Sequence, residues 1–263
     1  MAVTVLLGKA GSGKSTQCYR EIQACAAAGG KALLLVPDQA TYGAERHLAE
    51  HSEGQGFIGT QVVGFSRLAY NVFQERGLAH ASLSELARKI ILQRLLHKGE
   101  KEFSVLQTAA RQPNFADTAG RFLWECRSFC VTPDALRKAA EAVPNPTLSH
   151  KLEDISRLYG AYQDFLADHF GSADDTMTLL AREVGHYSFL QGAHVWVDGF
   201  QWFTPQQMEI LRQMERVTAQ VTITLTIDEE HLEQQRRETA LFHRAYEVYR
   251  DLKTLFPHLE TTK

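Results

Sequence analysis

The residues whose types and spacing can do chemistry are a glycine-rich run, GKAGSGKST at Gly8–Thr16, which follows an apolar run at Val3–Leu7. It fits the P-loop pattern G-x-x-x-x-G-K-[ST], in which glycines let backbone N–H groups surround phosphate oxygens. In such a loop the lysine, here Lys14, reaches the β- and γ-phosphates, and the following hydroxyl, here Ser15, ligates Mg²⁺. The expected nucleotide-binding residues are Gly8, Lys9, Ala10, Gly11, Ser12, Gly13, Lys14, Ser15 and Thr16. The alternative is a chance glycine-rich turn, which the flanking strand and helix signals argue against.

A nucleotide-bound Mg²⁺ also needs an acid at the end of a neighbouring strand. Asp198 directly follows the apolar run Val195–Val197 and is the candidate; the alternative is a strand-end aspartate that caps a turn. P-loop helicases place a glutamate next, as the base that activates the attacking water. Here the next residue is Gly199, which cannot accept a proton, and the nearest following carboxylate, Glu209, lies inside an expected helix. The sequence predicts a site that holds ATP and Mg²⁺ and has no catalytic residue for hydrolysis.

Composition sets the class of protein. The chain has 263 residues, 44% of them hydrophobic, and a net charge of −3, so it has no general attraction to nucleic acid. No apolar run approaches the roughly 20 residues of a membrane span, and no signal peptide precedes the first strand. The four cysteines are Cys18, Cys25, Cys126 and Cys130, and none belongs to a set with metal-ligand spacing. We expect reduced, buried thiols in a cytoplasmic protein with no membrane segment.

Apolar runs and helix signals alternate at both ends of the chain. The expected strands are Val3–Leu7, Lys31–Val36, Gln61–Val63, Val195–Val197 and Val221–Ile227. A helix follows the P-loop to about Ala28, another begins at Thr204 with a capping box, and a last one covers Gln235–Leu255. Strands that alternate with helices in this way form a parallel sheet.

The middle of the chain carries no strand signal. Between about Leu83 and Tyr187 apolar residues recur at helical spacing, in one stripe that includes Leu86 and Ile90 and another that includes Leu148 and Leu158. We therefore expect an α/β fold: a RecA-like P-loop domain, built from 1–75 and 191–263, that carries an all-α insertion subdomain at 76–190.

Two further segments follow the second and third expected strands, at the carboxyl ends where parallel sheets bind ligands. Their aromatic side chains can stack on bases, their arginine can contact phosphate, and their polar groups can hydrogen-bond to single-stranded DNA. The residues concerned are Gln39, Thr41, Phe65, Arg67 and Tyr70. The alternative is ordinary: the aromatic residues pack in the core and the arginine pairs with a carboxylate.

Four sequence motifs, which occur in a fixed order along the chain, resemble those of a known family. GKAGSGKST, LVPDQAT, VVGFSRLAY and VWVDGFQWFTPQQ begin at residues 8, 35, 62 and 195. Together they resemble the N-terminal part of AddB, the B subunit of the bacterial AddAB helicase–nuclease, a RecBCD-like enzyme. The match covers essentially the whole chain, and Asp-Gly-Phe at 198–200 is typical of that family.

The resemblance implies a role in the repair of double-strand DNA breaks by recombination, as one subunit of a heterodimer with an AddA-type motor. It implies a helicase-like domain without motor activity that scans single-stranded DNA for the Chi sequence, with the five residues above as Chi contacts; at Tyr70 the family often has tryptophan. The second RecA-like domain, which completes the ATP site with arginine, and the nuclease with its [4Fe-4S] cluster would lie outside this chain. The fragment alone should therefore be inactive as an ATPase.

Two other classes of function stay open at this stage. A self-contained P-loop enzyme such as a small-molecule kinase fits the loop, but Gly199 and the lack of an arginine-rich lid argue against it. The second class is an interaction module whose nucleotide site is vestigial. The intact Gly-Lys-Ser of the loop argues against this class. Binding of ATP and of single-stranded DNA separates all three.

Overall fold

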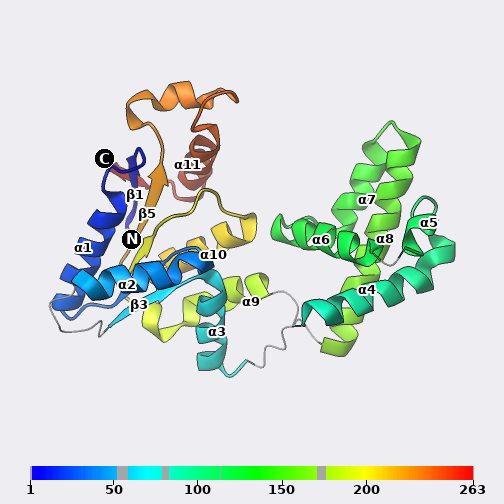
Figure 1. Cartoon of the computed structure of the whole chain (residues 1–263), viewed down its shortest axis with the longest axis horizontal. Helices are drawn as coiled ribbons and strands as arrows, with labels where there is room; N and C mark the ends of the chain where they lie inside the picture. The colour runs from blue at the N-terminus through cyan, green and yellow to red at the C-terminus, as the bar shows by residue number, and fades with distance from the viewer. Residues whose placement is uncertain (1, 52–58, 79–82, 113, 171–175, 263) are drawn as a thin grey trace. The chain divides into compact units, whose positions relative to one another are not determined.

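The computed structural model describes residues 2–51, 59–78, 83–112, 114–170 and 176–262. The chain divides into two compact units: Met1–Ala79 together with Met177–Lys263, which we call the α/β unit, and His80–Thr176, the helical unit. Both units are drawn in Figure 1. The fold class expected from the sequence is confirmed.

One six-stranded sheet, parallel throughout, organises the α/β unit, in the order β3-β2-β4-β5-β1-β6. Its strands are β1 (Ala2–Gly8), β2 (Ala32–Leu35), β3 (Thr60–Val63), β4 (His194–Val197), β5 (Gln220–Thr226) and β6 (Glu260–Thr262). The five expected strands are confirmed to within one or two residues. The sixth was not expected, because it is short, polar and exposed and has no apolar pattern.

Helices cover both faces of this sheet. They are α1 (Lys14–Ala27), α2 (Thr41–His51), α3 (Phe65–Arg76), α9 (Thr176–Glu183), α10 (Pro205–Glu215) and α11 (His243–Leu255), with 3-10 helices η1 (Asp38–Ala40), η3 (Val184–His186), η4 (Ser188–Leu190) and η5 (Glu229–Arg236). Figure 1 shows α1 and α11 on opposite sides of β1 and β5. The expected helix at Gln235–Leu255 is shorter than expected, because its first residues continue η5 and a turn instead.

Side chains that alternate along the strands pack in two separate hydrophobic cores, one on each face of the sheet. In β2, Leu34 faces α1 and α2 and packs with Ile22 and Leu48. Leu33 and Leu35 face the other way, into the larger core beneath α3, α9, α10 and α11. All three β2 leucines are fully buried, which is what a strand covered on both faces requires.

The segment just before β4 belongs to the α/β unit, although 76–190 was expected as one insertion. Leu180, Val184 and Leu190 are fully buried in the larger core of the sheet. Arg76 at the end of α3 pairs with Glu183 at 3.1 Å. The sequence pattern did not distinguish these helices from those of the insertion, because both carry apolar residues at helical spacing.

The helical unit has its own core. Its helices are α4 (Glu85–Gly99), α5 (Gln107–Ala110), α6 (Phe115–Ser128), α7 (Pro133–Ala142) and α8 (Pro146–Phe170), with the 3-10 helix η2 (Glu100–Glu102). Within α8, Asp154 is fully buried and its carboxylate accepts hydrogen bonds from three successive N–H groups, those of Ser104, Val105 and Leu106, at 2.8–3.0 Å. This carboxylate ties α8 to the segment that enters α5.

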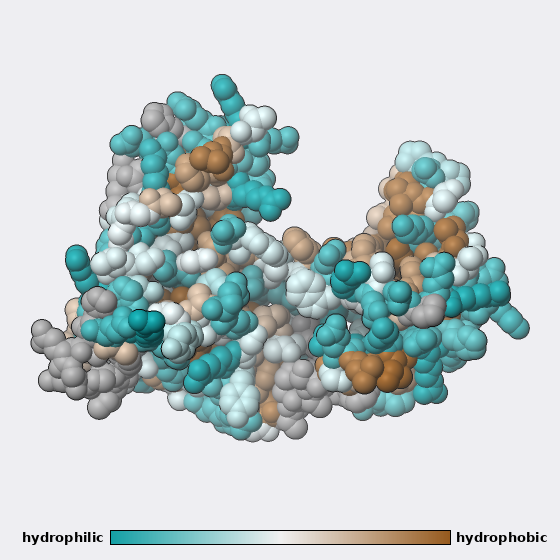
Figure 2. Space-filling model, in the orientation of Figure 1, coloured by the Kyte–Doolittle hydropathy of each residue, from teal (hydrophilic) through white to brown (hydrophobic). Residues whose placement is uncertain are grey.

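Some apolar residues of the helical unit face outward, contrary to the expected stripes. Leu86, Ile90 and Leu148 are 66%, 57% and 43% exposed. The stripe on α4 was misjudged because that helix carries apolar residues on two sides, and only Ile91, Leu92 and Leu96 are buried in it. Figure 2 shows brown hydrophobic patches on the visible surface of this unit. Among the described residues, no helix is long and apolar enough to span a membrane.

Candidate nucleotide site and single-strand surface

The glycine-rich run forms the turn between β1 and α1. β1 ends at Gly8, and α1 begins at Lys14 with Gly13 as its N-cap. Gly11 and Gly13 have φ values of +79° and +90°, a region that residues with side chains rarely adopt. Ser15 and Thr16 are exposed in the first turn of α1, where backbone N–H groups are unpaired and favour anions.

Lys14 lies along the inside of this turn. Its ammonium donates to the carbonyl oxygens of Gly8 and Lys9 at 2.8 and 2.9 Å, and to the hydroxyl of Ser12 at 3.3 Å. The positive charge is therefore held at the centre of the loop rather than in bulk solvent. The other lysine of the run, Lys9, points to Asp228, 3.4 Å away, and is more than half exposed.

Asp198 follows β4 on the same carboxyl edge of the sheet. One strand, β5, separates β4 from β1, so the acid lies on the second strand from the P-loop, not on the neighbouring strand that we expected. The Asp198 side chain is buried, 7% exposed, and its Oδ1 accepts a hydrogen bond from the hydroxyl of Thr224 on β5. Its backbone N–H donates to the carbonyl oxygen of Leu35 at 3.0 Å, which fixes the residue in the strand direction.

The charge of Asp198 acts on the residues of α1 below it. Burial, followed by the nearby Asp198 and Glu21 carboxylates, raises the pKa of the Cys18 thiol to about 12. Burial and the Asp198 carboxylate also raise the pKa of the Tyr19 phenol. Cys18 is fully buried, so it remains a protonated, unreactive thiol at physiological pH, as expected for a core cysteine. Cys130 is exposed, so the expectation that all four thiols are buried was wrong for that residue.

These residues fit a nucleotide with its magnesium ion. The loop combines positive-φ glycines, a lysine at its centre and an exposed hydroxyl at Ser15, and Asp198 supplies a carboxylate two strands away. Hydroxyl and carboxylate oxygens are the hard ligands that Mg²⁺ prefers, together with water and phosphate. Bound Mg²⁺ would neutralise charge on the phosphates.

The position after Asp198 disfavours a glutamate on conformational grounds. Gly199 has a φ of +80°, so a residue with a side chain would be strained there. Glu209 does not replace the missing base, because the Arg212 guanidinium and the Gln213 amide bind its carboxylate at 2.6–2.7 Å. The hydrogen bond from Arg212 is the main cause that lowers the pKa of Glu209.

The segment after β2 is helical. Gln39 is exposed within η1, and Thr41 begins α2, with its hydroxyl donating to the Asp38 carbonyl oxygen at 3.0 Å. The Asp38 carboxylate accepts a hydrogen bond from the Ser66 hydroxyl at 2.8 Å. This contact joins the two segments that were expected to meet single-stranded DNA.

The segment after β3 is also helical, and its three candidate residues lie in the first two turns of α3. Arg67 is exposed, and Tyr70 is 62% exposed. Phe65 is only 4% exposed and lies in the larger core, edge-on to Phe200 with ring centroids 5.6 Å apart. Tyr70 is thus available to a ligand in this conformation, whereas Phe65 packs in the core. Arg67 is exposed, but its guanidinium lies beside the Glu45 carboxylate, as in the alternative interpretation.

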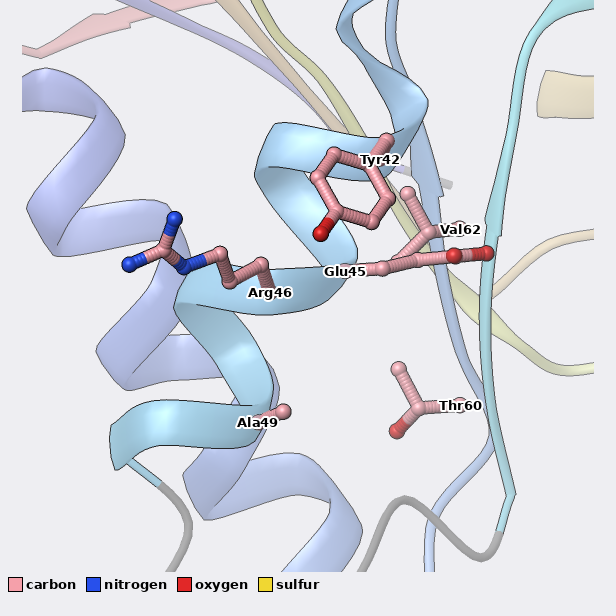
Figure 3. Close-up of a pocket in the computed structure, with 6 residues that line it drawn as sticks. All are labelled: Tyr42, Glu45, Arg46, Ala49, Thr60 and Val62. Atoms are coloured by element: carbon pink, nitrogen blue, oxygen red, sulfur yellow. The ribbon is translucent and has the colours of Figure 1, made fainter.

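A pocket of about 330 Å³ opens beside this surface, between α2 and the edge strand β3 (Figure 3). Its lining includes Tyr42, Glu45 and Thr60. The Glu45 carboxylate lies 3.6 Å from the Arg67 guanidinium, so it joins the pocket to the exposed side of α3. The Thr60 hydroxyl is buried and has no hydrogen-bond partner among the described residues.

The structure therefore brings the P-loop and Asp198 to one edge of the sheet, and it links the two candidate DNA segments through Asp38. Thr224 was missed by sequence reasoning, because a threonine in a strand is common and only the strand order places it beside Asp198. The parallel sheet, the loop and the strand-end acid together define an α/β protein of the P-loop class with a helical insertion.

Comparison with known proteins identifies the family within that class. The family model described as "ADDB, N-terminal" matches residues 5–262, so the chain belongs to the AddB N-terminal family. It is 38% identical to the B subunit of the ATP-dependent helicase/deoxyribonuclease of Pelotomaculum thermopropionicum, over 95% of this chain. The B subunits of the same name from Desulforamulus reducens and Bacillus subtilis are 36% and 34% identical, over 96% and 95% of this chain. The chain spans about a fifth of these relatives, 22% of each.

Proposed function

We propose that this chain is the helicase-like N-terminal domain of an ATP-dependent helicase–nuclease subunit, and that it binds ATP–Mg²⁺ at Gly8–Thr16. The observation that carries the proposal is the position of Lys14, which is held at the centre of a loop of positive-φ glycines. Ser15 and Asp198 would hold the metal. The relatives are named as B subunits of an ATP-dependent helicase/deoxyribonuclease, and these names support this role.

The isolated chain should hydrolyse ATP negligibly, even with DNA present. Gly199 offers no base, and Glu209 is already bound by Arg212. Removing a positioned base costs on the order of 10²–10⁴ in rate. The measurement is phosphate release with saturating ATP, with and without single-stranded DNA. Turnover above ~1 s⁻¹, within the usual range of enzymes, would mean that another residue acts as the base.

The second part of the proposal is a surface that reads single-stranded DNA, and Chi in particular, as the strand passes. Gln39, Thr41, Arg67 and Tyr70 would make the contacts. Support comes from the exposure of Arg67 and Tyr70 and from the hydrogen bond between Asp38 and Ser66 that holds the two segments together. Phe65 would act indirectly, by supporting the first turn of α3 from the core.

Arg67→Ala and Tyr70→Ala should therefore weaken binding of single-stranded DNA while leaving the fold intact. Stacking of a base on an aromatic ring is worth ~1–3 kcal/mol, so Tyr70→Ala should lower affinity about tenfold. Fluorescence anisotropy with labelled oligonucleotides measures this. In the heterodimer, Arg67→Ala should impair the pause at Chi and leave unwinding from a free end nearly unchanged.

Phe65→Ala is the contrasting variant. Loss of a buried phenylalanine costs about 3–5 kcal/mol of folding free energy, so its Chi response should change only together with its melting temperature. Normal DNA binding and a normal Chi response in well-folded Arg67→Ala and Tyr70→Ala proteins would remove the DNA-reading role from this surface.

The remaining features of the proposed assembly rest on the resemblance, and the word "subunit" in the relatives' names supports a partner chain. The chain would work in the cytoplasm with an AddA-type motor subunit that supplies translocation, on double-stranded DNA ends and the single strands made from them. We propose the same three-part organisation for its domains, with the expected bounds 1–75, 76–190 and 191–263 changed so that residues 177–190 join the α/β part. A [4Fe-4S] cluster would belong to a nuclease domain elsewhere in the full-length protein.

A further inference from the structure

Thr224 sits between the two halves of the proposed nucleotide site. In the register of the sheet, Leu6 of β1 lies opposite Thr224 of β5, and Val197 of β4 lies opposite Ile223. Asp198 therefore follows β4 at the level of Thr224. The strand that carries Thr224 also contacts the P-loop, because the N–H of Ile227 donates to the carbonyl oxygen of Gly8 at 3.1 Å.

The Thr224 hydroxyl has a specific partner in this position. The residue is 4% exposed, and its hydroxyl donates to Asp198 Oδ1. A buried hydroxyl needs a hydrogen-bond partner, and a valine of nearly the same shape would fill the same space without one. Leu6, which lies opposite Thr224 in β1 and so on the same face of the sheet, is an apolar residue of the core beneath α1, so packing alone does not require a hydroxyl here.

The hydrogen bond has two geometric consequences for Asp198. It restrains the side chain, whose backbone is already fixed by the bond to Leu35, in one orientation. One oxygen is thereby occupied, and Oδ2 is left as the oxygen that can meet the metal or a water bound to it.

We infer that Thr224 is a positioning residue of the nucleotide site: its hydroxyl holds the Asp198 carboxylate in the orientation that bound Mg²⁺ requires. This inference rests on the proposed nucleotide binding. It adds a residue on the strand between the P-loop and the acid, and it predicts that the hydroxyl contributes to the Mg²⁺-dependent part of nucleotide affinity.

The test compares ATP affinity with Mg²⁺ and with EDTA, by calorimetry, in the wild type and in variants of the whole chain. Thr224→Val should reduce the gain in affinity that Mg²⁺ provides by about tenfold, as expected for loss of a hydrogen bond to a charged group. Affinity in EDTA should stay unchanged. Thr224→Ser keeps the hydroxyl and should keep the gain. If Thr224→Val does not fold, Thr224→Ala removes the hydroxyl without adding a methyl beside the carboxylate.

Thr222→Val is the matched control, since Thr222 is also buried and lies two residues earlier on the same face of β5. It should retain the full Mg²⁺ gain. An unchanged gain in well-folded Thr224→Val, or an equal loss in Thr222→Val, overturns the inference and leaves nucleotide binding intact. If the wild type binds ATP equally with and without Mg²⁺, the inference is likewise overturned and nucleotide binding still stands. A wild type that binds no ATP in either buffer rejects the proposed function itself, and the inference with it.

Discussion

Replacing Lys14 by alanine should abolish measurable binding of ATP–Mg²⁺. The ammonium lies within 2.8–3.3 Å of three groups of its own loop, where phosphate oxygens would replace them as partners. Charge-assisted hydrogen bonds are worth about 1.5–3 kcal/mol each, so losing contacts to two phosphates should weaken binding by on the order of 100-fold or more. Isothermal calorimetry with the purified chain measures the loss.

Lys9→Ala is the control within the same loop. Its ammonium is 56% exposed and pairs with Asp228, and such surface pairs contribute at most about 1 kcal/mol. Lys9 would contribute to the loop through its backbone and not through its side chain, so the variant should bind nucleotide within a few-fold of the wild type. Equal affinities of the wild type and of a well-folded Lys14→Ala protein would contradict nucleotide binding by this loop.

Asp154→Ala should markedly destabilise the helical unit. Three successive N–H groups would lose their acceptor at a site where the carboxylate is fully buried. Unsatisfied buried donors cost about 1–3 kcal/mol each, and we expect a total of roughly 3 kcal/mol because two of the three are only part-buried. Hydrogen exchange read by peptide mass spectrometry should show faster exchange in α5–α8 and unchanged exchange in β1, β4 and β5.

Asp164→Ala removes an exposed carboxylate from the same helix and should leave exchange unchanged. If Asp154→Ala exchanges like this control, the three hydrogen bonds do not stabilise the unit. If the sheet exchanges faster as well, the two units unfold together and are not independent.

The P-loop and the fold class could be predicted from the sequence, whereas most packing contacts between side chains could not. The P-loop and the buried strands could be predicted because each is a local pattern: Lys14 within its glycines, and the apolar run around Leu34. The burial of Asp154 could also have been predicted, because it lies on the same face of its helix as Leu158 and Tyr162, which are both buried. An acid on such a face indicates a buried partner, although not which one.

Other features depend on contacts that no local pattern contains. β6 is three exposed residues long and exists because β1 offers it a free edge. Phe65 looked like a base-stacking residue, and its burial follows from the way α3 packs against Phe200. The partnership of Thr224 with Asp198 follows only from a strand order in which β5 lies between β4 and β1.

The contacts that join the two pieces of the α/β unit have a consequence for the folding pathway. Arg76 and Glu75 of α3 bind Glu183 and Ser188, so α3 and the segment before β4 meet although more than a hundred residues separate them in sequence. Closing a flexible chain of that length costs about 4 kcal/mol of entropy. The helical unit builds its core from its own residues, so it can fold first and replace that long coil with a compact body. Assembly of the sheet would then wait for the insertion, which acts as an internal folding nucleus for the domain that surrounds it.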